Sequence, residues 1–259
     1  MNKNDFTISD IRSENIKLPF YFLSDNHIST RKDPEQSKRM SDMLTLLDEI
    51  LKSKGTLFIL GDFFDFWFDK NHYVPSELSP IVEALKKLLD EGIEIHYVGG
   101  NHDYWIEGYL TNELGIRFYP DALRFEWEGK RFYCQHGDHI VYVGEQYPWV
   151  RKVLRDPLSI GLLKLLPIKW TYKLGEQVSH YNRNVPDIPR VSDLLVLKMK
   201  NYLEQKLKDG YDVALTGHVH EPYLHAGDNG TLVILGDWIH NRSYAYMDEH
   251  GLKLIQLKK

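Results

Sequence analysis

Short apolar runs alternate with amphipathic helical patterns over the first hundred residues of this 259-residue chain, and this alternation constrains the fold more than any other feature. The runs 20–23, 57–60 and 93–98 predict buried strands because they are short and bounded by turn residues. Between them, segments 34–52 and 79–90 place apolar residues at helical spacing. A strand–helix–strand–helix–strand order predicts a mainly parallel sheet with helices packed on it.

The pattern changes to strand signals from residue 116 onward. Segments 123–128 and 130–135 predict a hairpin joined by a Glu–Gly turn. Residues 140–184 are helical and irregular in character, and 191–208 predicts a long amphipathic helix. Further strands are expected at 213–215, 232–235, 243–247 and 252–257. The sequence therefore predicts one α/β layered domain over residues 1–259 with a helical insertion at about 140–185.

Composition excludes several classes of protein. With 42% apolar and 27% charged residues and no uninterrupted apolar stretch of 18, the chain is expected to be soluble rather than membrane-spanning. A formal charge of −5 argues against a nucleic-acid coat, which needs a basic face. The polar N-terminus contains no apolar run of secretory length, and Cys134 is the single cysteine, so we expect a cytoplasmic location.

Five short polar motifs follow apolar runs directly, and together they indicate a single site. In an open α/β sheet, ligands bind in the crevice at the carboxyl ends of the strands, so five strands can deliver these side chains to one place. Singly, each motif is weak, because Gly–Asp is common and an isolated histidine is usually structural. Five in order are hard to explain by packing. The motifs are Ser–Asp25–Asn–His27, Gly–Asp62, Gly–Gly–Asn101–His102–Asp103, His136–Gly–Asp138 and Gly–His218–Val–His220.

The residue types in these motifs point to a pair of divalent metal ions. Carboxylate, imidazole and amide oxygen suit a divalent transition ion, and the absence of thiolate ligands argues against a structural zinc site. Seven ligands are too many for one ion but divide between two when one carboxylate bridges, and Asp62 is the natural bridge. Such a pair clamps a phosphoryl group and generates hydroxide. The seven expected ligands are Asp25, His27, Asp62, Asn101, His136, His218 and His220.

At these residues the sequence resembles the calcineurin-like metallophosphoesterase superfamily, whose pattern is D-x-H, G-D, G-N-H-[DE], H and G-H-x-H. The resemblance implies a four-layer α/β/β/α sandwich and two metal ions, usually Mn²⁺. One ion would bind Asp25, His27, Asp62 and His220, and the other Asp62, Asn101, His136 and His218. Gly100 and Gly217 would let the chain turn tightly beside the metals.

Within that superfamily the chain resembles the UDP-2,3-diacylglucosamine hydrolases of lipid A biosynthesis. The likeness extends to the aromatic run 61–68, to Gly137–Asp138, to the insertion and to the ending Leu235–Gly–Asp–Trp238, and it covers nearly the whole chain. It implies hydrolysis of UDP-2,3-diacylglucosamine to 2,3-diacylglucosamine 1-phosphate and UMP. Many members of that family carry Arg where this chain has His102. Another calcineurin-like phosphodiesterase or phosphatase, acting on a nucleotide or other phosphoester, is therefore the alternative.

The same resemblance implies the roles of individual residues. The expected mechanism is in-line attack of a metal-bridging hydroxide on phosphorus, with Asp62, Asn101 and His102 as the catalytic residues. His102 either donates a proton to the leaving oxygen or supports a neighbouring group. We expect the substrate to be bound by Asn101, His102, Tyr147, Asn182, Arg183 and His218.

The insertion 140–185 differs in charge from the rest of the chain. It holds seven basic and three acidic residues, a net of +4 within a chain of −5, together with a group of leucines and two tryptophans. Such a segment suits an acylated phosphate ester and peripheral contact with the anionic cytoplasmic face of the inner membrane. The alternative is a helical pair whose apolar faces bury each other. No nucleic acid and no protein partner are expected.

Overall fold

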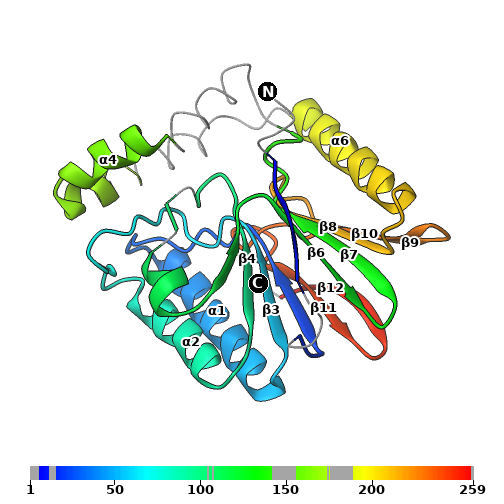
Figure 1. Ribbon diagram of the computed structural model, residues 1–259, viewed down its shortest axis with the longest axis horizontal. Helices are drawn as coiled ribbons and strands as arrows, with labels where there is room; N and C mark the ends of the chain where they lie inside the picture. The colour runs from blue at the N-terminus through cyan, green and yellow to red at the C-terminus, as the bar shows by residue number, and fades with distance from the viewer. Residues whose placement is uncertain are drawn as a thin grey trace.

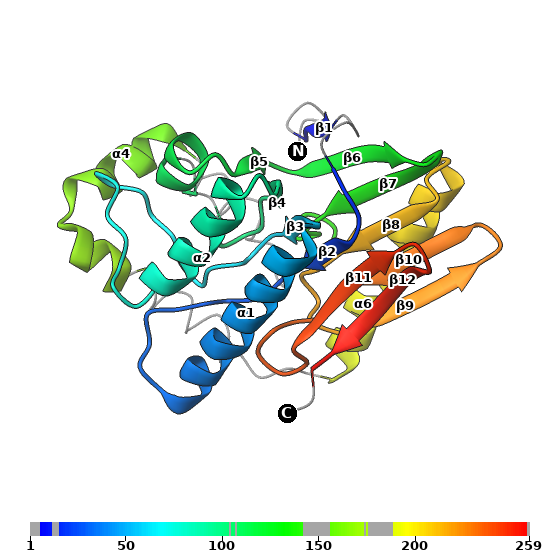
Figure 2. The same ribbon diagram turned by 90° about the horizontal axis from the view of Figure 1, so that it is seen from below.

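A computed structural model of the chain shows two six-stranded sheets stacked face to face, with helices on their outer faces (Figures 1 and 2). This arrangement is the α/β/β/α sandwich that the motif resemblance implies. The structure describes residues 6–11, 16–103, 105–106, 108–141, 156–173, 175 and 189–257.

The first sheet has the strand order β12-β11-β2-β3-β4-β5. Strands β2, β3, β4 and β5 are parallel, whereas β11 and β12 are antiparallel neighbours at one edge, so the sheet is mixed. Helices α1 (Pro34–Ser53) and α2 (Ser79–Asp90) connect the parallel strands as the alternating sequence pattern predicts. The strands are β2 (Phe20–Leu23), β3 (Thr56–Leu60), β4 (Ile95–Val98), β5 (Arg117–Tyr119), β11 (Ser243–Asp248) and β12 (Gly251–Gln256).

The second sheet has the strand order β1-β6-β7-β8-β10-β9 and is also mixed. The predicted hairpin is present as β6 and β7, and its turn residues Glu128 and Gly129 have φ of 49° and 75°, as a two-residue primed turn requires. Edge strands β1 and β9 were not expected from the sequence. The strands are β1 (Ile8–Asp10), β6 (Ala122–Trp127), β7 (Lys130–Gln135), β8 (Val213–Thr216), β9 (Tyr223–Gly227) and β10 (Gly230–Ile234).

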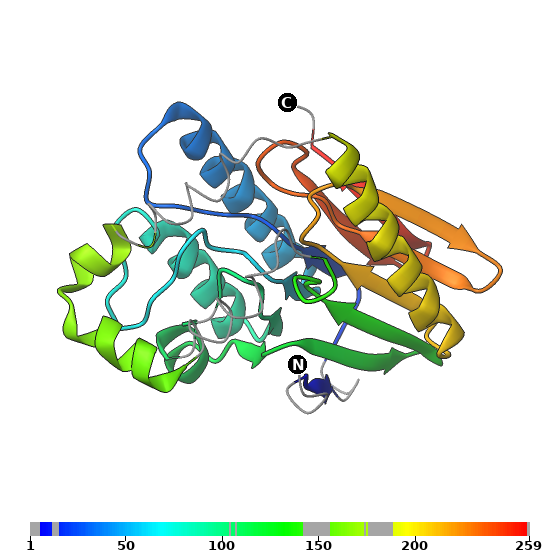
Figure 3. The ribbon, with the colours of Figure 1, turned by 90° about the horizontal axis from the view of Figure 1, so that it is seen from above.

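Three hydrophobic layers hold the sandwich together. Side chains alternate along β2, so that Tyr21 and Leu23 pack against α1 and α2, while Phe20 and Phe22 face the second sheet. The second sheet is covered on its outer face by α6 (Pro189–Lys208), whose Met199 packs with buried residues of β8 and β10. Figures 1 and 3 show α6 on the opposite side of the sandwich from α1 and α2. The central strands are therefore buried on both faces.

Local sequence signals explain where α1 begins and ends. The Asp33 side chain accepts a hydrogen bond from the Gln36 amide at 2.8 Å, and Pro34 occupies the first turn, where its missing N–H costs nothing. At the other end Lys54 adopts a left-handed conformation, and its amide donates a hydrogen bond to the Ile50 carbonyl. These caps position the start of α1 beside the loop that follows β2.

The described part of the insertion lies beside the loop that follows β3. Helix α4 (Pro157–Leu165) and the helical residues 168–173 sit at the periphery of the sandwich (Figure 1). The Tyr172 ring packs with Phe66 and Phe68, and its hydroxyl lies 3.4 Å from both the amide and the carbonyl of Phe68. Lys70 donates to the Leu166 carbonyl at 2.7 Å. No helix in the described segments combines the length and hydropathy that a bilayer crossing requires.

Candidate metal centre

The predicted ligands lie at the carboxyl ends of strands from both sheets. Asp25 and His27 follow β2, Asp62 follows β3 and Asn101 follows β4, all in the first sheet. His136 follows β7 in the second sheet, and His218 and His220 follow β8. The two groups meet because the His218 amide donates to Asp25 Oδ2 at 2.8 Å, and His136 Nε2 lies 3.4 Å from Asp62 Oδ2. The structure thus brings all seven expected ligands together.

An unusual backbone conformation marks this site. Ten non-glycine residues among the described ones have a positive φ, and half of them are expected ligands. This left-handed region is sparsely populated by residues with a Cβ and persists where the surrounding structure imposes it, often at functional sites. These five residues, with φ between 45° and 69°, are Asp25, His27, Asp62, His218 and His220.

The first group of donors surrounds Asp25. Its Oδ1 lies 3.2 Å from His220 Nε2, and Ser24 donates to its Oδ2 at 2.6 Å. Within the described part of the chain neither ring nitrogen of His27 makes a hydrogen bond, although the residue is only 2% exposed, and its Nε2 lies 4.0 Å from Asp62 Oδ2. Donor atoms of Asp25, His27 and His220 lie within 4.8 Å of one another, so one ion can reach all three.

The second group surrounds Asp62 and His136. His136 Nε2 lies 3.2 Å from both Asn101 Oδ1 and His218 Nδ1. The other nitrogen, Nδ1, lies 2.8 Å from the Leu60 carbonyl, which can only accept, so Nδ1 carries a proton and Nε2 is the nitrogen that would bind an ion. Burial opposes a charged ring, but Asp62 and then Asp25 raise the pKa of His136, so an ion would replace a proton at Nε2. Donor atoms of Asp25, Asp62 and His136 also lie within 4.8 Å of one another. Asp62 therefore stands between the two groups, where a bridging carboxylate would have to be.

Two glycines make room for the carboxylates. A Cβ on Gly100 would collide with Asp62 Oδ1, and a Cβ on Gly217 would collide with Ser24 Oγ and Asp25 Oδ2. Neither glycine has a positive φ, so close approach rather than turn geometry explains the residue type. The tight turns expected at these two glycines are therefore not the reason that glycine is needed there; the reason is the space that the neighbouring side chains occupy.

His102 and Asp65 form a third cluster with His27, in which Asp65 Oδ1 lies 3.6 Å from His27 Nδ1. The His102 amide donates to Asp62 Oδ1 at 2.9 Å, and its ring Nδ1 lies 2.7 Å from the Asp65 carbonyl. Because a carbonyl only accepts, Nδ1 carries a proton, and Nε2 lies 3.9 Å from Asp62 Oδ2. His102 can thus present Nε2 to a substrate beside the metal ligands.

Asp103 stabilises the turn that carries the site. It accepts hydrogen bonds from the amides of Asp62 and Gly100 at 2.6 and 2.9 Å and from the Tyr97 hydroxyl at 2.7 Å. Burial, and next the charge of Asp62, raise the pKa of Asp103 to about 7. Through these contacts Asp103 caps the turn that joins the Asp62 and Asn101 segments.

Asp237 is a residue that the sequence analysis missed. Its Oδ2 lies 3.4 Å from His220 Nδ1 and 3.0 Å from His240 Nδ1, and its Oδ1 accepts from the amides of His240 and Asn241. It orients His220 from the side opposite Asp25. The available signal was Gly236–Asp237 directly after a predicted strand, the same pattern as Gly61–Asp62.

The electrostatics of the site favour cations. Burial opposes ionisation of Asp62. The positive charge of the neighbouring histidines, of which His136 has the largest effect, outweighs burial and holds the pKa of Asp62 well below its usual range. Burial lowers the pKa of His220, yet Asp25 and Asp237 together raise it to about 10. Burial and the nearby His136 lower the pKa of His218 to about 4. The negative charge of the buried carboxylates, which favours protonated histidine, also attracts divalent ions. This set of nitrogen and oxygen donors therefore suits divalent metal ions.

Three expected substrate-binding residues, Tyr147, Asn182 and Arg183, lie outside the described residues. The others, Asn101, His102 and His218, lie at the metal centre.

Comparison with known proteins agrees with this geometry. Residues 18–222 match the calcineurin-like phosphoesterase family. The chain belongs to this family. It is 30% identical to UDP-2,3-diacylglucosamine hydrolase of Porphyromonas gingivalis, over 92% of this chain and 97% of that protein. It is 28% identical to UDP-2,3-diacylglucosamine hydrolase of Neisseria meningitidis serogroup B, over 93% of this chain and 99% of that protein.

An archaeal phosphodiesterase of known structure aligns with 93% of this chain and 100% of its own, with a TM-score of 0.47 and 15% sequence identity. Family membership and the clustered donors make the protein a metal-dependent hydrolase that uses divalent ions.

Proposed function

We propose that the protein hydrolyses the pyrophosphate of UDP-2,3-diacylglucosamine, adding water across one P–O bond to give 2,3-diacylglucosamine 1-phosphate and UMP. The observation that carries the proposal is the convergence of seven donors from both sheets in a chain similar along nearly its full length to hydrolases of that name. Asp25, His27, Asp62 and His220 would hold one ion, and Asp62, Asn101, His136 and His218 the other. Mn²⁺ is the proposed metal.

The chain's own residues have separate tasks in this reaction. When bound, two divalent ions neutralise phosphoryl oxygens and lower the pKa of water. The Leu60 carbonyl and Asp237 orient the imidazoles of His136 and His220. His102, held at Nδ1 by the Asp65 carbonyl, directs Nε2 toward the substrate side. When the ring carries protons on both nitrogens, Nε2 is placed to give its proton to the leaving oxygen.

The described part of the insertion supports an acylated substrate and peripheral contact with an anionic membrane. Side chains of Leu158, Leu162, Leu165 and Trp170 are 60–79% exposed, which argues against an insertion whose apolar faces only bury each other. Lys164, Lys169 and Lys173 are exposed on the same segment. We propose that 140–185 forms the lid of a single domain spanning 1–259 and lies against the cytoplasmic face of the inner membrane.

A substrate assay tests the proposed function. Full-length protein with Mn²⁺, detergent and UDP-2,3-diacylglucosamine should release UMP, and Asp62→Asn should lower that rate at least about 100-fold because the bridging carboxylate is lost. Asp228→Asn, an exposed loop carboxylate, is the matched control and should keep the wild-type rate.

Two outcomes would contradict the proposal. Rapid Mn²⁺-dependent turnover of soluble phosphodiesters without UMP release from the lipid would assign the protein to another phosphodiesterase activity. Undiminished turnover by Asp62→Asn would contradict the two-ion site itself.

A further inference from the structure

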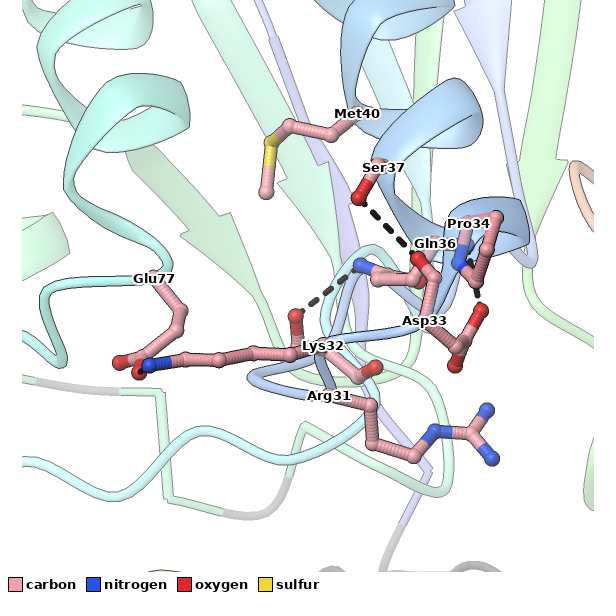
Figure 4. A pocket seen from close by; sticks show the side chains of 9 residues that line it. Arg31, Lys32, Asp33, Pro34, Gln36, Ser37, Met40 and Glu77 are labelled. Atoms are coloured by element: carbon pink, nitrogen blue, oxygen red, sulfur yellow. Dashed lines mark hydrogen bonds and ion pairs between the residues drawn. The ribbon is translucent and has the colours of Figure 1, made fainter.

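A pocket of about 440 Å³ lies between the start of α1 and the loop that precedes α2 (Figure 4). Its lining includes Ser29, Arg31, Lys32, Gln36 and Glu77, and none of its lining residues is an expected metal ligand. The volume falls within the range of pockets that bind small molecules, about 300–1,000 Å³. The pocket begins two residues after His27 along the same loop, and the proposed reaction gives it no role.

Two polar groups that line this pocket lack partners among the described residues. Ser29 is 3% exposed and lines the pocket, yet its Oγ makes no hydrogen bond within the described part of the protein. The buried Nε of Arg31 is likewise without a partner there. Figure 4 shows Arg31 and Lys32 extending in opposite directions, with only Lys32 reaching Glu77. A buried hydroxyl and a guanidinium nitrogen left unpaired are costly unless a ligand satisfies them.

Most acceptors around the pocket, by contrast, already have a partner. Glu77 accepts from Lys32 and from the Ser76 hydroxyl, each at 2.9 Å. The Asp33 carboxylate caps the Gln36 amide at 2.8 Å, and the Ser29 carbonyl accepts from Gln36 Nε2 at 3.0 Å. Among the described residues that line the pocket, the buried polar atoms without a partner are Ser29 Oγ and Arg31 Nε, and no ion pair holds the Arg31 guanidinium. Such a site selects a ligand rich in acceptor oxygens.

We propose that this pocket is a second anion site, separate from the metal centre, which binds the phosphate group of a small phosphorylated ligand. Arg31 provides a fork of donors that matches phosphate oxygens, Ser29 adds a buried donor, and the start of the 20-residue α1 adds favourable electrostatic potential. Two sources share this chemistry, a nucleoside monophosphate and free inorganic phosphate. UMP as the nucleotide rests on the proposed function, whereas the phosphate site itself does not.

Calorimetric titration of the full-length Mn²⁺-loaded protein with UMP, inorganic phosphate and uridine tests this site. Wild type should bind phosphate at two sites. Asp62→Asn should keep only the pocket site, and the double variant Ser29→Ala, Arg31→Gln should keep only the metal-centre site, with pocket affinity at least tenfold lower. Lys38→Gln, which removes an exposed charge from α1 outside the pocket lining, is the matched control and should bind as wild type does.

The probes separate the possible sources. Tighter pocket binding of UMP than of inorganic phosphate supports the nucleotide source, and equal binding supports free phosphate. Pocket binding of uridine as tight as that of UMP, or loss of all phosphate binding in Asp62→Asn, would overturn the second site. Failure of UMP release from the lipid, with pocket binding of phosphate intact, would count against the proposed function alone.

Discussion

The residues that build the metal centre are supported by neighbours that hold them in place. His220 lies between Asp25 and Asp237, with its two nitrogens 3.2 and 3.4 Å from the two carboxylates. His136 is held by the Leu60 carbonyl, and Asp62 by the His102 amide. Carboxylates and carbonyls behind a ligand fix its tautomer and orientation, and they contribute to metal affinity without touching the ion.

Asp237→Asn should therefore weaken metal binding while the protein still folds. An amide in place of the carboxylate removes the charge that faces His220 Nδ1, and the affinity for Mn²⁺ should fall about 10–100-fold. Titrating Mn²⁺ into metal-depleted protein measures this change, with Asp228→Asn as the control. An unchanged Mn²⁺ affinity would show that Asp237 serves only the turn at His240 and Asn241.

Sequence patterns predicted most residues of the metal centre but not all of them. The seven expected ligands were found because each follows an apolar run, a signal that strand topology converts into proximity. Asp237 has the same Gly–Asp pattern but was not assigned a role, because nothing local shows that its strand, β10, lies beside β8. The left-handed backbone at Asp25 and His27 was also invisible, since tertiary contacts rather than residue type impose it.

At the scale of elements, the exposed apolar face of the insertion has a direct test. Leu165 and Trp170 are 79% and 70% exposed, so replacing both with Gln should leave stability unchanged. If they enter a lipid interface, sedimentation with phosphatidylglycerol-containing vesicles should show binding weakened at least about tenfold.

Helix α6 supplies the matched control for this experiment. Leu194 and Leu197 are 50% and 53% exposed on that helix, and replacing them with Gln removes similar apolar surface elsewhere on the molecule. Equal loss of vesicle binding in both variants would indicate non-specific hydrophobic binding to the vesicles and would contradict a membrane-facing insertion.

Strand β4 carries a buried histidine outside the metal centre that should make stability depend on pH. Burial lowers the pKa of His96, although Glu94, 3.1 Å away, opposes the shift. The folded protein therefore takes up this proton less readily than the unfolded chain. The free energy of unfolding should fall as the pH drops below about 6.5, the ordinary pKa of histidine.

His96→Phe keeps an aromatic ring between Phe58 and Tyr119 but cannot titrate. Urea unfolding at pH 7.5 and 5.5 should show a smaller acid-induced loss of stability in this variant than in wild type, and His250→Phe at the exposed turn is the control. An identical pH dependence in both variants would assign the loss to other groups.

The elements themselves were predicted where burial was strong and missed where it was weak. Strands β2, β3 and β4 are buried on both faces and were recognised as apolar runs. Edge strand β9 is half-buried to exposed, contains Gly227 and pairs only with β10 in its sheet, so no alternation marks it. Strand β1 has three residues, which is too short for a hydrophobic pattern to identify it. β1 depends on a partner distant in sequence, since Ile8 pairs with Ala122, whereas β9 forms a hairpin with the neighbouring β10.

At the scale of the whole molecule, the metal centre joins the two sheets. Asp25 and Asp62 come from the first sheet, and His136 and His218 from the second, so bound ions would cross-link the halves of the sandwich. The same arrangement places several buried carboxylates close together, and their repulsion destabilises the fold unless positive charge is present. Metal binding and stability should therefore be linked.

Removing the metal should lower the melting temperature of the wild-type protein. A ligand that binds only the folded state stabilises it by about 2.7 kcal/mol at 100 times its Kd, which corresponds to roughly 5–10 °C for a chain of this size. Calorimetry with Mn²⁺ and with EDTA measures the difference. Asp62→Asn, which lacks the bridging carboxylate, should melt at nearly the same temperature under both conditions. A wild-type protein insensitive to EDTA would contradict a metal centre that spans both sheets, because ions bound across the interface cannot leave without loosening it.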